Sequence, residues 1–407
     1  MIKIIKCRSC KSKSLINVFN LGSQHLTGVF PKKKNIKISK GELNLCLCKS
    51  CSLLQLRNNF DHNEMYGEDY GYMSSLNSSM RFHLKKKSKN LIKKYSLKKK
   101  DLIIDIGSND GTFLSYFSKD FNLIGIDPTI KKFGEKYRND IIKISDFFSE
   151  KSIKNKTNKK AKLISSIAMF YDLEDPEIFV DSIYNLLEKN GIWHLELSYM
   201  PSMIKNLSYD TICHEHLEYY SLRSIKNLFD RHKLKIIDIE FNAINGGSFA
   251  LDVAKKESTL KENKRIIKWV LHKEKIFKSN DFKTIKNFYL NCQKHKFLLK
   301  KLISNLIKEK KTIFGYGAST KGNVILQYCN LTEKNIPYIA EINKSKFNKY
   351  TPGTNIKIIS EKQAKLKKPD YFLVLPWHFR DNIIHRETDY LNSGGKMIFP
   401  LPEIEII

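Results

Sequence analysis

The chain has 407 residues and a mass of 47.5 kDa, which is enough for two or three domains with cores of ordinary size. A hydrophobic content of 41% excludes a fibre or a disordered tail, and the sequence has no apolar run near the roughly 20 residues that span a bilayer. The formal net charge is +30, but the lysines are spread along the whole chain, so we expect solvated surfaces and neither a nucleic-acid nor a membrane partner. The amino terminus lacks the pattern of a secretory signal, and we expect a cytoplasmic protein.

The predicted elements fall into three segments. Residues 1–60 predict a compact cysteine-containing module, with strands over 42–47 and 52–56. Residues 61–255 begin with an aromatic segment and a Lys-rich helix. They then alternate helical stretches with apolar runs of strand length, which indicates a parallel sheet with helices on both faces; those runs are 102–106, 123–126, 163–168 and 192–197. Residues 256–407 predict connecting helices up to about 310 and then a second α/β domain, with a helix over 320–328 and strands over 312–316, 338–342, 371–375 and 396–399.

Five of the eight cysteines lie in the first 51 residues, a clustering that in a reducing compartment indicates metal ligation. Cys7 and Cys10 form one C-x2-C knuckle, and Cys48 and Cys51 form another, so four thiolates are available to one structural Zn²⁺ ion. A set of free buried cysteines is the alternative. Cys46 is a spare sulfur, but only Cys48 preserves the two-residue spacing.

A glycine-containing turn follows the first strand of the central segment. The predicted strand ends in Asp105, and the turn runs from Gly107 to Gly111, where glycines let the backbone approach a ligand and a helix start offers unpaired N–H groups. About 20 residues later a second strand ends in Asp127, which is placed to accept both hydroxyls of a ribose. Asp146 and Phe147 follow the next strand and suit the edge and the face of an adenine. The pattern predicts a nucleoside-containing cofactor, with a generic βαβ turn and an NAD site as alternatives.

The run 209–221 contains three adjacent ionisable groups, His214, Glu215 and His216, which are costly to bury without a purpose. A histidine with a near-neutral pKa is the natural proton acceptor at physiological pH. The two histidines share a face if the run is extended, and they diverge if it is helical. A structural pair of histidines at a helix cap is the alternative, and the spacing does not match the H-E-x-x-H zinc helix.

The second α/β domain opens with another glycine-rich turn, Gly315 to Asn323. Its backbone N–H groups and Lys321 are suited to a pyrophosphate, and Glu341 ends the next strand where a ribose contact is expected. Taken alone, this turn is typical of an NAD(P)-dependent nucleotide-sugar oxidoreductase, or of a tight turn with a purely structural role.

The acids at three strand ends resemble those of class I S-adenosylmethionine-dependent methyltransferases. The cysteine knuckles and the segments YGEDYGYMSS, DIGSNDGT, HEHLEYYSL, NGGSFA, GYGASTKGN and YTPGT occur in the order found in the sugar C-methyltransferase family, over nearly the whole chain. The resemblance implies a class I methyltransferase sheet flanked by a zinc module and a C-terminal Rossmann-like domain. It also implies transfer of a methyl group to a ring carbon of a nucleotide-linked keto-deoxysugar through a base-generated enolate.

The resemblance assigns roles residue by residue. It implies His216 as the general base, with Glu215 and His214 as its helpers. It places the cofactor, S-adenosylmethionine, against Tyr70, Ser74, Asp105, Gly107, Ser108, Asn109, Gly111, Asp127, Asp146 and Phe147. It places the nucleotide-sugar substrate against Tyr72, Asn245, Ser248, Ser319, Lys321, Asn323 and Glu341.

Three departures from the family pattern concern the substrate. Cys213 stands where a Tyr precedes the HEH segment, and Ala250 stands where an Arg follows the GGS motif. The segment 169–172 lacks a His that is common after the fourth strand. A sugar O-methyltransferase therefore stays an alternative, and the sequence does not reveal the sugar, its nucleotide or the oligomeric state.

Overall fold

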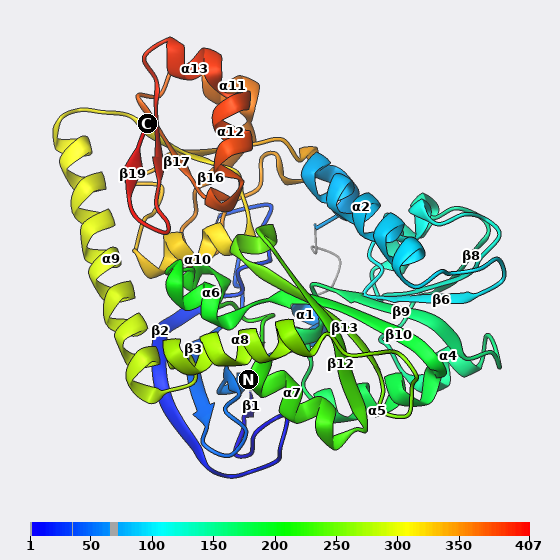
Figure 1. Ribbon diagram of the computed structural model, residues 1–407. Coiled ribbons are helices and arrows are strands. Elements are labelled where there is room, and N and C mark those ends of the chain that lie inside the picture. Colours follow the sequence, from blue (N-terminus) through cyan, green and yellow to red (C-terminus); the bar gives the residue numbers. More distant parts are fainter. Residues whose placement is uncertain (1, 35, 66–71) are drawn as a thin grey trace.

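The computed structural model describes residues 2–34, 36–65 and 72–407. Its three main sheets are built largely from successive parts of the chain, and the two termini lie well apart (Figure 1). Among the described residues, none of the helices is long and apolar enough to cross a membrane.

The first sheet belongs to the cysteine-containing module. Its long hairpin, β2 (Leu15–His25) and β3 (Lys40–Cys48), is antiparallel and is followed by β4 (Leu54–Leu56). The fourth strand, β11 (Glu218–Tyr219), comes from the centre of the chain and pairs with β4, so the HEH region is attached to this module. The short strands β1 (Ile2–Lys3) and β5 (Asn58–Asn59) pair beside it, and helix α1 spans His62–Met65.

The second sheet has seven strands in the order β12-β13-β10-β9-β6-β7-β8. Five of them are mutually parallel and largely buried, as expected for strands covered by helices on both faces. These five are β6 (Leu102–Ile106), β7 (Asn122–Ile126), β8 (Ile141–Ile144), β9 (Ala161–Ile167) and β10 (Leu187–Ser198). The associated helices are α2 (Ser78–Lys94), α3 (Ile130–Phe133), α4 (Glu150–Lys154), α5 (Pro176–Leu186), α6 (Met200–Lys205) and α7 (Leu222–Arg231).

This second sheet is mixed, which corrects the expectation of a purely parallel one. Strand β13 (Ser248–Lys255) runs antiparallel to both β10 and β12 (Leu234–Asn242). Strands β12 and β13 are joined by only a few residues, a connection too short for the crossover that parallel strands need. The turn requires left-handed backbone at Gly246 and Gly247, with φ of 86° and 124°.

The direction of the chain reverses at β6. The chain passes from β6 to β7 and β8 on one side, and it then returns to β9 on the other side of β6. Ligands of open α/β sheets bind at such a switch point, outside the carboxyl ends of the strands. The predicted cofactor turn follows β6 directly and therefore lies at this position.

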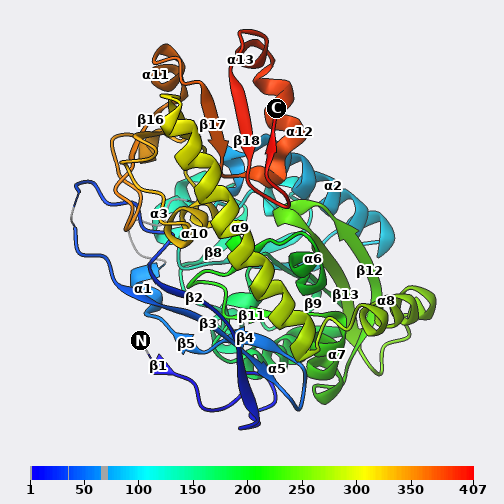
Figure 2. The same ribbon diagram turned by 90° about the vertical axis from the view of Figure 1, so that its left-hand side faces the viewer.

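Two helices connect the second sheet to the third, α8 (Lys264–Phe277) and α9 (Phe282–Lys308). The side chain of Asn263 accepts a hydrogen bond from the backbone of Ile266 and caps the start of α8. Helix α9 runs along the outside of the first sheet, where Phe288 stacks on Phe19 with ring centroids 5.3 Å apart (Figure 2).

The third sheet has the order β16-β15-β14-β17-β18-β19, and only β19 is antiparallel to its neighbour. The predicted strands are present as β14 (Ile313–Tyr316), β15 (Tyr338–Glu341), β17 (Tyr371–Val374) and β18 (Lys396–Phe399), and the predicted helix is α10 (Thr320–Tyr328). The elements that were not predicted are β16 (Lys357–Ser360), β19 (Glu405–Ile406), α11 (Glu361–Leu366), α12 (Arg380–Arg386) and α13 (Thr388–Asn392). The chain is thus an α/β protein with two sheets of Rossmann-like topology.

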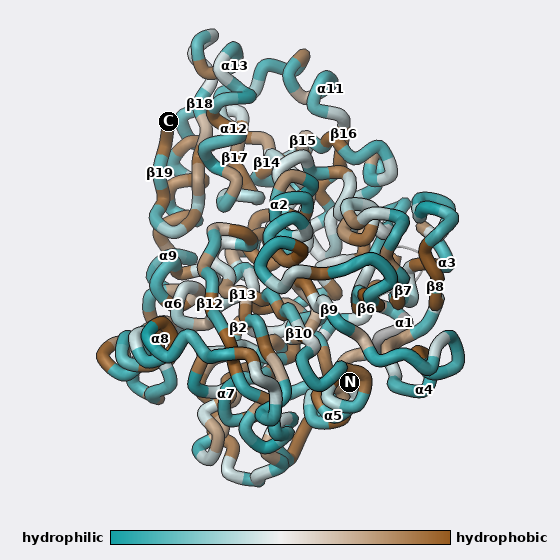
Figure 3. Tube along the Cα trace, turned by 45° about the vertical axis from the view of Figure 1, so that its right-hand side comes forward, coloured by the Kyte–Doolittle hydropathy of each residue, from teal (hydrophilic) through white to brown (hydrophobic). Residues whose placement is uncertain are grey.

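The cores of the three parts are continuous. One hydrophobic cluster joins Leu43 of the first sheet to Phe314 of the third, and a second contains Cys48 together with Trp193 of the central sheet. Hydrophobic residues gather on the interior strands, whereas α2 is largely hydrophilic at the surface (Figure 3). The metal-ligating module is therefore packed into the rest of the protein and is not an appended domain.

Candidate active site and metal centre

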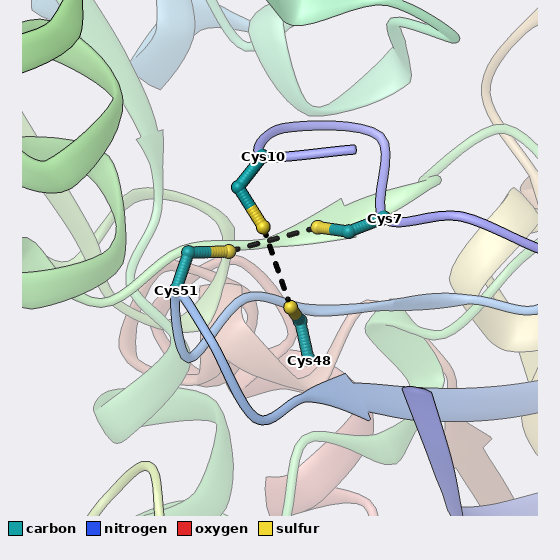
Figure 4. Close-up of side chains that lie close together, drawn as sticks. All are labelled: Cys7, Cys10, Cys48 and Cys51. Carbon is teal, nitrogen blue, oxygen red and sulfur yellow. Dashed lines mark hydrogen bonds between the residues drawn. The ribbon is translucent and has the colours of Figure 1, made fainter. Parts of the chain in front are cut away.

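The four predicted metal ligands converge on one point. The Sγ atoms of Cys7, Cys10, Cys48 and Cys51 all lie within 4.8 Å of one another (Figure 4). The Cys7–Cys51 and Cys10–Cys48 sulfur distances are 3.6 and 3.5 Å. These distances are close to the roughly 3.8 Å edge of a tetrahedron with Zn–S bonds of about 2.3 Å. Cys46 is buried in β3 and is not part of the cluster.

The two knuckles have the same backbone geometry. The N–H of Lys11 donates to the carbonyl of Cys7, and the N–H of Ser52 donates to the carbonyl of Cys48. Both donors have left-handed backbone, with φ of 56° and 65°. Gln55 Nε2 donates to Cys7 Sγ over 3.2 Å, which stabilises a thiolate. The residues present fit Zn²⁺ in a structural role, because all four positions of a tetrahedral ion are filled by protein sulfur.

The predicted cofactor turn has the left-handed backbone that its glycines allow. Gly107 and Gly111 have φ of 72° and 75°, and a Cβ atom on Gly107 would lie 2.8 Å from Met169 Cγ. Asp127 Oδ2 accepts from the backbone N–H of Asn109 over 2.9 Å, and its Oδ1 accepts from the N–H and the hydroxyl of Thr129. A carboxylate has about four acceptor positions, so these bonds orient Asp127 and leave one for a ribose hydroxyl.

Asp105 lies beneath this turn. It is one residue before the end of β6, is 4% exposed and accepts a 2.6 Å bond from Ser165 Oγ. Burial raises the pKa of its carboxyl to about 7. Ser108 is also buried, with its hydroxyl 2.7 Å from Tyr137 Oη. The side chains of Asp105 and Ser108 are therefore both buried and hydrogen-bonded within the chain.

A segment before α2 covers the turn. The N–H of Ser74 donates to Asn109 Oδ1 over 3.0 Å, and Asn109 Nδ2 donates to the carbonyl of Tyr72 over 3.2 Å. The N–H of Ser75 donates to Asp110 Oδ2. Ser74 is therefore near the turn as predicted, the Tyr72 side chain is exposed, and Tyr70 lies outside the described residues.

The predicted adenine contacts lie at the surface. Asp146 Oδ1 accepts from the N–H of Phe147, whose side chain is 47% exposed after β8. Both follow the carboxyl end of the strand beside β7, so they share the edge of the sheet at which Asp127 is found.

The HEH segment is neither a regular strand nor a helix, and its two histidines contact different parts of the molecule. His214 Nε2 donates to the carbonyl of Gln24 on β2 over 3.1 Å, and its ring packs edge-on against Phe60. His214 is fully buried, and burial lowers its pKa to about 4. These contacts tie the segment to the first sheet.

His216 contacts a different set of residues. Its Nδ1 lies 2.7 Å from the carbonyl oxygen of Thr211, and its ring contacts that of Tyr171 edge-on at 4.4 Å. A carbonyl only accepts, so Nδ1 carries the proton and Nε2 carries the free lone pair. Burial, and secondarily the nearby charge of Lys321, lower the pKa of His216 to about 4, which keeps the ring neutral. Tyr171 lies in the 169–172 segment, where the family pattern has a histidine.

Glu215 lies between His214 and His216 and points toward the first module. Burial raises the pKa of its carboxyl. The backbone at Gly28 approaches so closely that a Cβ there would overlap Glu215 Oε1. Glu215 Oε2 has no hydrogen-bond partner among the described residues.

Lys321 brings the C-terminal turn to the same region. Its Nζ donates to the carbonyl of Asn245, in the turn between β12 and β13, over 2.7 Å. Burial is the main cause of the low pKa of both His216 and His378, and the Lys321 charge lowers both pKa values further. Lys321 is thus the predicted substrate residue whose charge acts on the pKa of His216.

The other predicted substrate residues have partners within the chain. Ser319 Oγ caps α10, and Ser248 Oγ donates to the carbonyl of Ile244. Asn323 is fully buried, and its Nδ2 donates to the carbonyl of Thr27 over 2.7 Å. Glu341 accepts from three backbone N–H groups, those of Ala318, Ile342 and Asn343. One N–H group of the glycine-rich turn is therefore already bound to a carboxylate.

A narrow pocket adjoins His216, and its lining includes residues that were not predicted. It has room for about one water molecule. Besides His216, Tyr171 and Thr211, its wall includes Ser198 at the end of β10 and Glu218 and Tyr219 of β11. Glu218 and Tyr219 belong to the HEHLEYYS run, and their closeness in sequence to the two histidines was the one sequence signal that could have identified them.

Comparisons with known proteins agree with this geometry. Three family models match the chain in order: a zinc binding domain over residues 7–66, a methyltransferase domain over 80–239 and a C-methyltransferase C-terminal domain over 243–402. The chain belongs to the S-adenosylmethionine-dependent C-methyltransferases with an N-terminal zinc module. The cofactors of the protein are therefore S-adenosylmethionine and zinc, and the methyltransferase assignment excludes the oxidoreductase that the C-terminal turn alone allowed.

A curated relative extends over the whole chain. It is the C-methyltransferase NovU of Streptomyces niveus, 28% identical over 411 residues, which covers 99% of this chain and 97% of the relative. Solved structures match smaller parts. The plantazolicin methyltransferase BpumL in complex with a triazolic analogue and SAH is 16% identical, with a TM-score of 0.35 over 44% of this chain and 86% of that one. An S-adenosylmethionine-dependent methyltransferase from Clostridium acetobutylicum ATCC 824 is 13% identical, with a TM-score of 0.34 over 42% and 92%.

Proposed function

We propose that this C-methyltransferase methylates a ring carbon of a nucleotide-linked keto-deoxysugar and that His216 generates the enolate. The contact of His216 Nδ1 with the Thr211 carbonyl carries the proposal, because it fixes the tautomer with a basic Nε2. A carbon next to a ketone becomes nucleophilic only after it loses a proton, so carbon methylation needs a base of this kind. The depressed pKa of His216 keeps the base unprotonated near neutral pH.

The cofactor site that we propose is the edge of the sheet at β6 and β7. Gly107, Asn109 and Gly111 give the turn its left-handed backbone there, and Asp127 keeps one acceptor position for a ribose hydroxyl. S-Adenosylmethionine, when bound, supplies an electrophilic methyl group. Holding that group and the carbon nucleophile in line contributes much of the catalysis.

The nucleotide-sugar is proposed to bind between the central and C-terminal sheets. Lys321 supports this location, because its positive charge reaches the turn at Asn245 and acts on His216. A half-buried ammonium group suits a diphosphate.

We also propose a division into a zinc module (1–60), a methyltransferase domain (61–255) and a helical connection with the Rossmann-like domain (256–407). The unpaired thiols of Cys213, Cys292 and Cys329 fit a reducing compartment, and we propose the cytoplasm as the location of the protein.

A panel of keto-deoxysugar nucleotides, analysed by mass spectrometry with S-adenosylmethionine present, tests the function. We expect one member to gain a CH2 group. A substrate deuterated at the ring carbon next to the ketone should lose that deuterium on methylation. Retention of the deuterium together with a mass gain would indicate O-methylation and would refute the enolate.

A further inference from the structure

The pocket beside His216 contains buried polar atoms that the fold does not use. Ser198 Oγ and Tyr219 Oη have no hydrogen-bond partner in the part of the chain that the structure describes. Tyr219 is only 4% exposed. Buried polar atoms are paired in the great majority of cases, so two unpartnered hydroxyls on residues that line one small space indicate a site built for a polar group.

The two hydroxyl groups, those of Ser198 and Tyr219, are suited to donate hydrogen bonds to an oxygen in the pocket. The carboxyl of Glu218 has a different setting: it accepts from the Tyr220 hydroxyl over 2.8 Å, and Glu218 lies opposite Gln55, whose amide contacts the metal ligand Cys7. Neighbouring residues of a strand point to opposite faces, so Glu218 is directed toward the zinc module and Tyr219 away from it. A space of about one water molecule accommodates a single oxygen atom and no larger group.

The position of the pocket connects it to both reaction partners. His216, the proposed base, forms part of its wall. Tyr171, also in the wall, lies two residues after Met169, which packs against Gly107 of the cofactor turn. Ser198 is the last residue of β10, at the carboxyl edge of the sheet. An oxygen in the pocket would therefore lie beside the base and one loop away from the cofactor turn.

We infer that this pocket is an oxyanion site in which the hydroxyls of Tyr219 and Ser198 donate hydrogen bonds to the carbonyl oxygen adjacent to the reacting carbon. The inference rests on the proposed function. His216 Nε2 takes the proton as the C–H bond breaks, and the electron pair of that bond forms the C=C bond while the carbonyl π pair moves onto the oxygen. When the carbon attacks the methyl group, the carbonyl re-forms, and the electron pair of the broken C–S bond stays on sulfur. Donors aimed at the developing oxyanion stabilise it more than they stabilise the ground-state ketone.

Tyr219→Phe tests this site, because it removes one hydroxyl and little volume. We expect kcat to fall by about 100-fold with KM within about 3-fold, as for the loss of one oxyanion donor. Exchange of the ring hydrogen with D2O, measured by mass spectrometry without S-adenosylmethionine, should slow by the same factor, because exchange needs the enolate but no methyl transfer. Tyr199→Phe is the matched control: its buried hydroxyl donates to Glu274 over 2.8 Å, outside the pocket, and kcat and exchange should stay at wild-type values.

The outcomes separate this inference from the proposed function. Wild-type kcat and exchange in Tyr219→Phe would overturn the oxyanion site, as would a raised KM with unchanged kcat, which would indicate contact with a non-reacting group. If thermal unfolding shows that Tyr219→Phe does not fold, Ser198→Ala decides by the same two measurements. A wild-type protein that neither exchanges the ring hydrogen nor methylates any keto-sugar nucleotide would instead refute the proposed function.

Discussion

His216 Nδ1 donates to the carbonyl oxygen of Thr211 over 2.7 Å, and this contact leaves Nε2 as the ring nitrogen able to act as the proposed base. His216→Asn should therefore abolish methyl transfer while leaving the dissociation constant for S-adenosylmethionine within a few-fold, since the cofactor turn lies on other elements. Calorimetric titration and a radiolabel transfer assay measure the two quantities. His272→Asn, an exposed histidine on α8, is the control. Unchanged turnover in His216→Asn would exclude the residue from the mechanism.

Lys321 should contribute to the pH range over which His216 is unprotonated. Burial is the main cause of the low pKa of His216, and the Lys321 charge adds to it. Activity requires the unprotonated ring, so wild-type kcat/KM should fall only as the pH decreases toward about 4. Lys321→Met removes the smaller of the two causes and leaves the burial, so the pKa of His216 should rise in part and the acidic limb of the pH profile should move to higher pH. Lys334→Met, at an exposed position, should leave the limb in place, and an unmoved limb in Lys321→Met would contradict the electrostatic coupling.

The zinc site should be essential for the fold of the first module. Cys48→Ser removes one of four ligands, so elemental analysis should show loss of the one zinc ion per chain and the unfolding temperature should drop markedly. Cys46→Ser alters a buried sulfur two residues away in the same strand and should retain the metal. Equal zinc content in both variants would show that the cluster does not hold the ion.

His214 makes stability depend on pH. Its folded pKa of about 4 lies below the unfolded value of 6.5, so the unfolded chain binds a proton first as the pH falls. Between pH 6.5 and 4 this group lowers the free energy of unfolding by about 1.4 kcal/mol per pH unit. His214→Gln keeps a donor for the Gln24 carbonyl but does not titrate. The stability advantage of wild type over this variant should therefore shrink across that window in denaturant titrations, and a constant difference would contradict a buried neutral His214.

Asp127 should control cofactor affinity. Asp127→Ala removes the acceptor that holds the N–H of Asn109 as well as the position left for a ribose hydroxyl. We expect S-adenosylmethionine to bind at least about 10-fold more weakly in calorimetric titration, a loss of about 1.4 kcal/mol. Asp120→Ala, in the exposed loop before β7, is the control and should bind normally. Normal binding in Asp127→Ala would place the nucleoside elsewhere.

Local spacing was sufficient for the features that depend on a few consecutive residues. The two knuckles and the Gly107–Gly111 turn are set by short-range backbone geometry, so the sequence identified Cys48 over Cys46 correctly. Long buried strands such as β6 and β10 were also predictable, because their apolar runs exceed what a surface loop contains.

Features that depend on contacts distant in sequence were not predictable. Tyr219 reaches the pocket because β11 pairs with β4 of the first module, and nothing in the local pattern indicates that pairing. Asn323 was predicted to contact substrate but is bonded to Thr27, a contact that exists only once the first and third parts have packed together. Strand β16 is four residues long, too short for its alternation to stand out.

Gly28 of the zinc module lies directly against Glu215, so the zinc module forms part of the surroundings of the HEH segment. His214 is bonded to β2 of that same module, so two of the three HEH side chains take their positions from a substructure folded around metal. An apo protein should thus be inactive without any change in the residues that perform the reaction. Cellular zinc supply then becomes a precondition for methyl transfer, and a loss of activity in protein prepared with chelators would reflect incomplete folding and not a defect in the reacting residues.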